Sequence, residues 1–256
     1  MSDETTTHIE NSLKAPSILH TSLNISKVTA ARLAILFYVL LALLSPLGLL
    51  LPPQWIDEGD AAGTVESIQA NDTLFRVAIV LNIFGQTCFL LVGIAFYELY
   101  KDVNRLQAKL LLAFVAVSVP ITIGMEVFHL GALHLVGDAE YLGNLNNAEI
   151  NAQVVFMMSM YEFGIHIVSI FWGLWLIPLG YLSYKSEYLP KVLGILLIIN
   201  GVSYVLDVIN WIVFSQEVEM INTVLLIGAA IGELPTILWL LIMGFNLPVR
   251  RVRLWG

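Results

Sequence analysis

The sequence predicts an all-α membrane protein, a polytopic helix bundle of six transmembrane helices with both termini in the cytoplasm. Three observations predict this fold class. First, 58% of the 256 residues are apolar and 12% are charged, whereas soluble domains carry about 25% charged residues. Second, six segments contain the roughly 20 mostly apolar residues that a helix needs to cross a bilayer. Third, basic and acidic residues occupy alternate loops.

The six apolar segments define the predicted spans. In chain order they cover residues 33–51, 77–99, 110–136, 154–182, 192–214 and 223–245. The third and fourth are long enough to tilt or to extend beyond the lipid. The loop 52–73 on the outer side has room for a short helix. No loop is long enough for a separate domain.

This division gives one membrane domain with two tails. Residues 1–29 form a polar cytoplasmic tail, residues 30–246 form the six-helix transmembrane domain, and residues 247–256 form a basic cytoplasmic tail. We expect the basic tail to contact anionic lipid head groups at about 1 kcal/mol per charge.

The basic residues determine the predicted orientation. Of the twelve lysines and arginines, Arg76 alone lies in a loop on the acidic side. The other eleven lie before the first span, in the second and fourth loops, or after the sixth span: Lys14, Lys27, Arg32, Lys101, Arg105, Lys109, Lys185, Lys191, Arg250, Arg251 and Arg253. Lysine and arginine are enriched in cytoplasmic loops, so this side is assigned to the cytoplasm.

Composition and motifs argue against several functions. The net charge of −8 and the lack of a basic face argue against nucleic acid as a partner and leave the lipid bilayer as the one partner that the sequence indicates. The single cysteine, Cys88, excludes an intramolecular disulfide and a cysteine-based zinc site. Nucleotide-binding glycine loops and the Gly-x-Ser-x-Gly motif of serine hydrolases are missing. The sequence does not decide whether the chain is an enzyme.

Ionisable residues inside the predicted spans are the main functional signal, because such residues are costly at bilayer depth and often mark functional sites. Glu126 and His129 lie three residues apart in one span, and Glu162 and His166 lie four apart in the next. Such spacings put both members of a pair on one helix face. We expect six of these side chains to converge in one cavity: Glu126, His129, Glu162, His166, Asp207 and Glu233.

Three interpretations of this cluster stay open. The six side chains are candidate ligands of a divalent metal ion, such as a zinc ion held by two histidines and one carboxylate with an open position for water, and such a site could hydrolyse a lipid-like substrate. A haem between His129 or His134 and His166 is a variant of this interpretation. Alternatively, the cluster serves proton- or cation-linked transport of a small molecule. Finally, the protein is a non-catalytic sensor or assembly protein, and the cluster only joins helices.

Several short stretches combine glycine, proline and aromatic residues. The clearest is Phe171-Trp172-Gly173-Leu174-Trp175, which runs into Pro178-Leu179-Gly180-Tyr181-Leu182, and others are Arg32-Leu33-Ala34, Gly59-Asp60-Ala61-Ala62, Leu74-Phe75-Arg76, Leu189-Pro190 and Gly194-Ile195-Leu196-Leu197. These stretches resemble a bacterial family catalogued as domain-of-unknown-function family 4386. The resemblance covers residues 30–245. It implies a six-span protein of the bacterial cytoplasmic membrane and implies no activity.

Overall fold

The computed structural model describes residues 26–57, 59–137, 145–214, 219–248 and 250–254. The predicted polar tail lies almost entirely outside these ranges. The described α-helices are α2 (Lys27–Leu50), α3 (Ala61–Ala70), α4 (Asp72–Tyr100), α5 (Arg105–Val136), α6 (Asn147–Ser186), α7 (Lys191–Phe214) and α8 (Glu219–Ile242). A short 3₁₀ helix η2 (Pro52–Trp55) follows α2, and strands β1 (Phe245–Asn246) and β2 (Arg251–Val252) follow α8.

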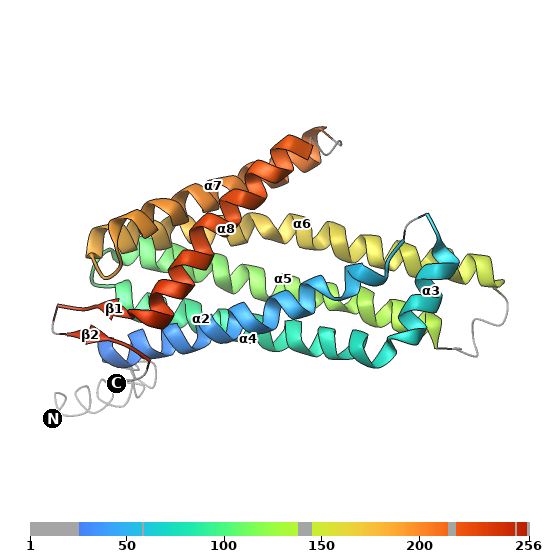
Figure 1. Cartoon of the computed structure of the whole chain (residues 1–256), viewed down its shortest axis with the longest axis horizontal. Coiled ribbons are helices and arrows are strands. Elements are labelled where there is room, and N and C mark those ends of the chain that lie inside the picture. The colour runs from blue at the N-terminus through green and yellow to red at the C-terminus, as the bar shows by residue number, and fades with distance from the viewer. Residues whose placement is uncertain (1–25, 58, 138–144, 215–218, 249, 255–256) are drawn as a thin grey trace, which may run out of the picture.

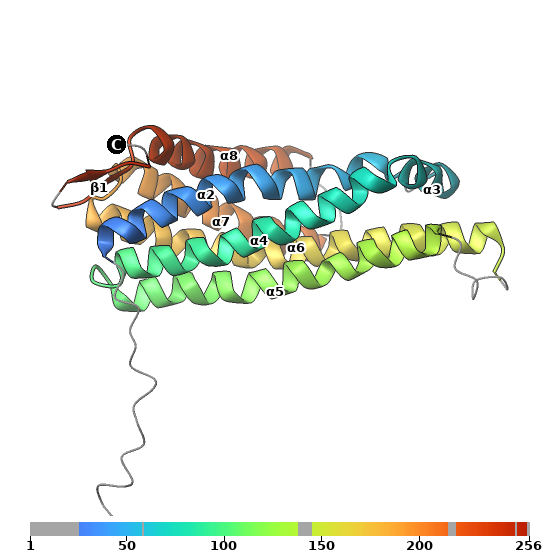
Figure 2. The same ribbon diagram turned by 90° about the horizontal axis from the view of Figure 1, so that it is seen from below.

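Helices α2 and α4 to α8 form an elongated up-and-down bundle (Figure 1). Helix α4 packs between α2 and α5, α6 packs between α5 and α7, and α8 packs mainly on α7. Helix α3 lies at one end of the bundle and the β1–β2 hairpin lies at the other. Helices α7 and α8 tilt away from the long axis, and α5 and α6 run on past them toward the end that carries α3 (Figure 2).

The surface of the bundle is suited to lipid. Among the described residues, five helices are long and apolar enough to cross a membrane, namely α2, α4, α5, α6 and α7. Each of the six long helices also exposes large apolar side chains, for example Leu43, Phe84, Val127, Phe163, Ile212 and Leu238. The chain is therefore a multi-pass membrane protein. Helix α8 has 24 residues and contains the apolar stretch Ile231–Ile242, and its role as a sixth span remains a prediction.

Polar residues define the helix ends. The Asn104 side chain accepts hydrogen bonds from two backbone N–H groups of the first turn of α5, and Asn146 and Glu149 form a capping box at the start of α6. Both arrangements satisfy N–H groups that lack a partner within the helix. Glu187 ends α6 in the left-handed conformation, with φ of 59°. Its carboxylate lies 2.8 Å from the Lys191 ammonium, which lowers the pKa of the Glu187 carboxyl.

Two pairs of glycines bring the backbones of α6 and α7 into contact. A Cβ atom added to Gly173 would lie 2.6 Å from the carbonyl oxygen of Gly201, and one added to Gly194 would lie 2.7 Å from that of Gly180. Neither distance leaves room for a side chain, and small residues are what allow membrane helices to approach this closely. The stretches around Gly173, Gly180 and Gly194 that carry the family resemblance therefore have a structural role.

Two apolar clusters fill the bundle. The larger one centres on Trp175 of α6, which contacts Tyr38 of α2 and Phe89 of α4 at ring-centroid distances of 5.9 and 4.9 Å. The smaller one joins the end of the bundle to α3 through Ile68, Phe75, Ile79, Ala132, Leu133, Val154 and Met158. The polar groups described below lie against these two clusters.

The C-terminal segment forms a short hairpin after α8. Gly244, with φ of 68°, follows α8, and Phe245 pairs with Val252 across an antiparallel hairpin. Both side chains are buried in the larger cluster, so the predicted sixth segment is wrong at its end, where Phe245 belongs to a strand. The cause is the hairpin, whose apolar residues add to the core after the helix has ended. Arg250, Arg251 and Arg253 stay exposed, so their predicted contact with lipid head groups stays a prediction.

Candidate functional site

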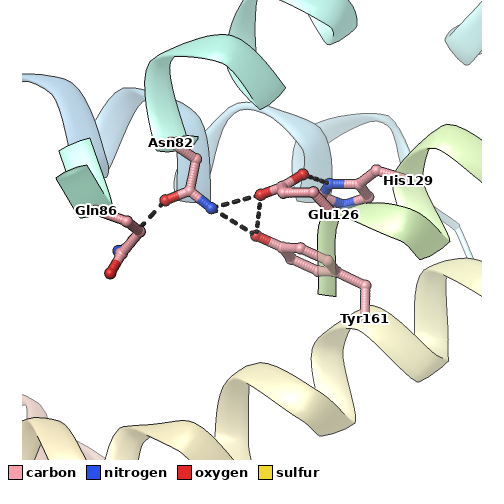
Figure 3. Close-up of polar contacts among 5 residues, drawn as sticks. All are labelled: Asn82, Gln86, Glu126, His129 and Tyr161. Carbon is pink, nitrogen blue, oxygen red and sulfur yellow. Dashed lines mark hydrogen bonds and ion pairs between the residues drawn. The ribbon is translucent and has the colours of Figure 1, made fainter. Parts of the chain in front are cut away.

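Glu126 and His129 of α5 form a buried carboxylate–imidazole pair. One oxygen of Glu126, Oε2, lies 2.8 Å from Nδ1 of His129 (Figure 3). The side chains of Glu126 and His129 are 3% and 1% exposed. Their spacing of three residues places them on one face of α5, as expected from the sequence.

Two neighbouring helices supply further hydrogen bonds to the Glu126 carboxylate. Asn82 of α4 donates a hydrogen bond from Nδ2 to Glu126 Oε1, and the Tyr161 hydroxyl of α6 donates to the same oxygen at 3.2 Å. Gln86, one turn along α4, donates to Oδ1 of Asn82 at 3.5 Å. In Figure 3 these side chains form one continuous chain from Gln86 to His129. This network therefore joins α4, α5 and α6 where each would otherwise expose a polar group to an apolar interior.

Aromatic rings enclose the imidazole. The Tyr161 ring stacks on His129 at a centroid distance of 3.6 Å and an interplanar angle of 25°, and the edge of Phe75 approaches it at 5.1 Å. The second ring nitrogen, Nε2, is buried and has no hydrogen-bond partner among the described residues. Within the described ranges, His129 is the basic side chain paired with Glu126, and no lysine or arginine pairs with it. The hydrogen bond between the two groups lowers the free-energy cost of burying both of them in a medium of low dielectric constant.

A second polar group lies at an open cavity between α2 and α8. Glu233 of α8 accepts a hydrogen bond of 3.3 Å from the Tyr38 hydroxyl. The cavity measures about 360 Å³ and is lined from five helices by Tyr38, Leu41, Ala42, Ser45, Pro46, Leu49, Leu50, Gln86, Phe89, Trp172, Trp175, Tyr204, Glu233, Leu234 and Ile237. Gln86 thus belongs to both sites, because its amide nitrogen reaches Asn82 and its side chain lines the cavity.

The other predicted side chains lie apart from Glu126 and His129. His166 stacks on Trp211 of α7 at 4.7 Å, Glu162 is exposed, and Asp207 is half-buried on α7. The predicted convergence of all six residues in one cavity is therefore wrong. The physical reason is the rotation of α6. Tyr161 faces α5, and the next residue, Glu162, points about 100° away around the helix.

This arrangement does not favour the predicted metal centre. In the part of the chain that the structure describes, no three histidine, cysteine, aspartate or glutamate side chains are close enough to share a metal ion. A zinc ion takes three or four protein ligands, and the Glu126–His129 pair supplies two. A haem needs His129 and His166 to face each other across one gap, whereas these imidazoles stack on different rings, Tyr161 and Trp211.

Sequence reasoning did not find the two tyrosines. Tyr161 donates to the buried carboxylate of Glu126 and Tyr38 to the half-buried carboxylate of Glu233, but tyrosines in membrane helices usually occupy the lipid–water interface. The signal that could have found the network was the Asn82–Gln86 pair at i,i+4 on α4, because buried amides in a span need partners on a neighbouring helix.

Comparison with known proteins places the chain in a family. The model of the family described as "Domain of unknown function (DUF4386)" matches residues 33–244. The chain belongs to this family. An uncharacterized protein of Archaeoglobus fulgidus is 35% identical over 79 residues, which are 30% of this chain and 44% of that protein. This chain therefore matches less than half of that relative. No solved structure matches the chain. The family match contains both polar sites described above.

Proposed function

We propose that this family member crosses the cytoplasmic membrane six times, with both termini inside, and binds a small apolar molecule from the lipid phase in the cavity between α2 and α8. The observation that carries the proposal is the cavity itself. Its volume of about 360 Å³ falls within the usual range for small-molecule sites, roughly 300–1,000 Å³. Its walls are mainly apolar and aromatic with a few polar groups, which is the usual composition of such sites.

Access to the cavity is from the lipid. Two of its lining side chains, Leu50 and Leu234, are 64% and 56% exposed on the outer surface of the bundle. Helices α2 and α8 contact each other little, whereas α2 packs closely on α4 and α8 packs closely on α7. A molecule dissolved in the membrane can therefore enter between α2 and α8 without separating a packed helix pair.

A cavity-filling substitution tests this proposal. We expect Ala42→Phe, which adds a ring to the cavity wall, to weaken binding of 1-adamantanol by about tenfold or more, since the ring and the ligand compete for the same volume. Titration calorimetry on protein in lipid nanodiscs, corrected with empty nanodiscs, measures the affinity. Leu43→Phe is the matched control, because Leu43 is exposed outside the cavity. Equal affinities of the two variants, or no binding by the unaltered protein, would contradict the proposal.

The six-span topology has its own test. In a Cys88→Ala background, we expect an impermeant maleimide added to intact cells to label Gln54→Cys and to leave Lys185→Cys and Arg253→Cys unlabelled. All three positions are exposed, and the positive-inside rule assigns only Gln54 to the outside. Lysed cells serve as the control, in which all three variants react. Labelling of Arg253→Cys in intact cells would place the end of the chain outside and would contradict a sixth span.

Proton-linked transport is the second candidate. The observation that favours it is Gln86, which connects the cavity to the Glu126–His129 pair through Asn82. Occupancy of the cavity could thereby change the hydrogen bonding around a group that can hold a proton. Accumulation of the ligand in proteoliposomes under a proton gradient distinguishes transport from binding alone. Metal-dependent hydrolysis of a lipid-like substrate, and a location in the bacterial cytoplasmic membrane in particular, stay predictions.

A further inference from the structure

We propose that the cavity selects apolar molecules that carry a protonated amine. This inference rests on the proposed binding function and adds the chemical class of the ligand. It follows from three features of the cavity wall, namely an acidic group, two unpaired acceptors and a group of aromatic rings.

The acidic group is Glu233. Its carboxyl group faces Tyr38, whose hydroxyl donates to Oε1 at 3.3 Å, and the side chain lines the cavity. None of the described residues that line the cavity is a lysine, arginine or histidine. A carboxylate at the middle of a membrane bundle is stabilised by a cation that enters beside it. The same charge repels fatty acids and other anions, which restricts the ligand class.

The unpaired acceptors are Ser45 and Gln86. Ser45 Oγ and Gln86 Oε1 are buried without a hydrogen-bond partner among the described residues, and both side chains line the cavity. Asn82 accepts a hydrogen bond from the nitrogen of the Gln86 amide, so Oε1 is the end of this amide that lacks a partner. Both oxygens are covered in this structure, and Ser45 Oγ lies against Gly85 of α4. An alkylammonium has three N–H donors. Rotation of the Ser45 and Gln86 side chains, which belong to the cavity wall, would bring two further acceptors beside Glu233. A hydroxyl group has one donor and would leave acceptors unpaired.

Aromatic rings supply the rest of the site. Tyr38, Phe89, Trp172, Trp175 and Tyr204 line the same cavity. The negative faces of such rings attract ammonium groups, and their area accommodates the apolar body of the ligand. The combination of a carboxylate, amide and hydroxyl acceptors and aromatic walls favours an amine over a neutral molecule of equal shape.

A matched pair of ligands tests the inference. 1-Adamantylamine and 1-adamantanol share one hydrocarbon cage and differ in their polar group, and the amine is protonated at pH 7. We expect the amine to bind about tenfold more tightly than the alcohol in nanodiscs, because it gains charge-assisted hydrogen bonds. Glu233→Gln should remove this preference and leave alcohol binding within about twofold. Glu162→Gln, which neutralises an exposed carboxyl group on α6 outside the cavity, is the control and should change neither affinity.

Each outcome has a separate meaning. Equal binding of amine and alcohol overturns the ligand class and leaves the cavity function standing. An amine preference that survives in Glu233→Gln also overturns the inference, because a group other than Glu233 would then attract the ammonium group. Failure of both ligands to bind contradicts the cavity function itself. If Glu233→Gln does not fold, Gln86→Leu serves as the second variant, and it should lower the affinity for the amine more than the affinity for the alcohol.

Discussion

Replacing Gly194 with leucine is expected to lower the free energy of unfolding by about 3 kcal/mol, because overpacking costs up to this amount or more. Even a Cβ atom at this position would lie 2.7 Å from the Gly180 carbonyl oxygen and 2.9 Å from the Tyr184 amide nitrogen. Both neighbours are backbone atoms, so a side chain fits only if α6 and α7 move apart. Heating the purified protein with a thiol-reactive dye measures the effect, since Cys88 is the one cysteine and is buried.

Gly124→Leu is the matched control for this experiment. Gly124 also lies inside a long helix, but an added Cβ would meet nothing within 4 Å, and the residue is exposed. We expect this variant to be as stable as the unaltered protein or up to about 1 kcal/mol more stable, since leucine is the better helix former. Equal stabilities of the two variants would show that the contact of α6 with α7 does not depend on glycine.

The second large effect is expected for Glu126→Ala. Removing this carboxyl group leaves Asn82, Tyr161 and His129 without their common partner. Breaking a buried, hydrogen-bonded charge pair in this way costs about 3 kcal/mol or more. We therefore expect the dye to reach Cys88 at a clearly lower temperature. Glu126→Gln keeps an acceptor for Asn82 and Tyr161 and should lose about 1 kcal/mol.

Glu162→Ala controls for the loss of an acidic residue, because Glu162 follows Tyr161, which contacts Glu126. Because Glu162 is exposed, its removal should change the stability by less than about 0.5 kcal/mol. If Glu126→Ala unfolds at the same temperature as Glu162→Ala, the network does not hold α4, α5 and α6 together. The non-catalytic interpretation of the polar residues would then lose its main support.

The helices themselves could be predicted from the sequence, because each apolar segment is long enough to exclude other structures at membrane depth. Helices α4, α5, α6 and α7 contain the second to fifth predicted segments, and α2 contains the first except for its last residue, Leu51. The Glu126–His129 pair was also predictable, since both residues lie on one helix and their spacing fixes the face that they share. The short helix expected in loop 52–73 exists as α3.

The assembly of residues from different helices could not be predicted in this way. Spacing within α6 says that Glu162 and His166 share a face, but the rotation of α6 follows from its contacts, with Gly173 and Gly180 against α7 and Tyr161 toward Glu126. The cavity depends on the tilt of α8 relative to α2, which no periodicity in one helix encodes. The terminal hairpin was missed because two-residue strands have no recognisable period.

The smaller apolar cluster limits how fast Glu126 and His129 exchange protons with bulk water. It covers His129 through Phe75 and continues into Ile68 of α3, so the buried pair is sealed at this end of the bundle. A proton that leaves or reaches Glu126 and His129 has to wait until these side chains open. The rate of exchange with bulk water is then set by local unfolding of the cover, on a scale of roughly microseconds to seconds. Loosening the packing of α3 would therefore speed this exchange.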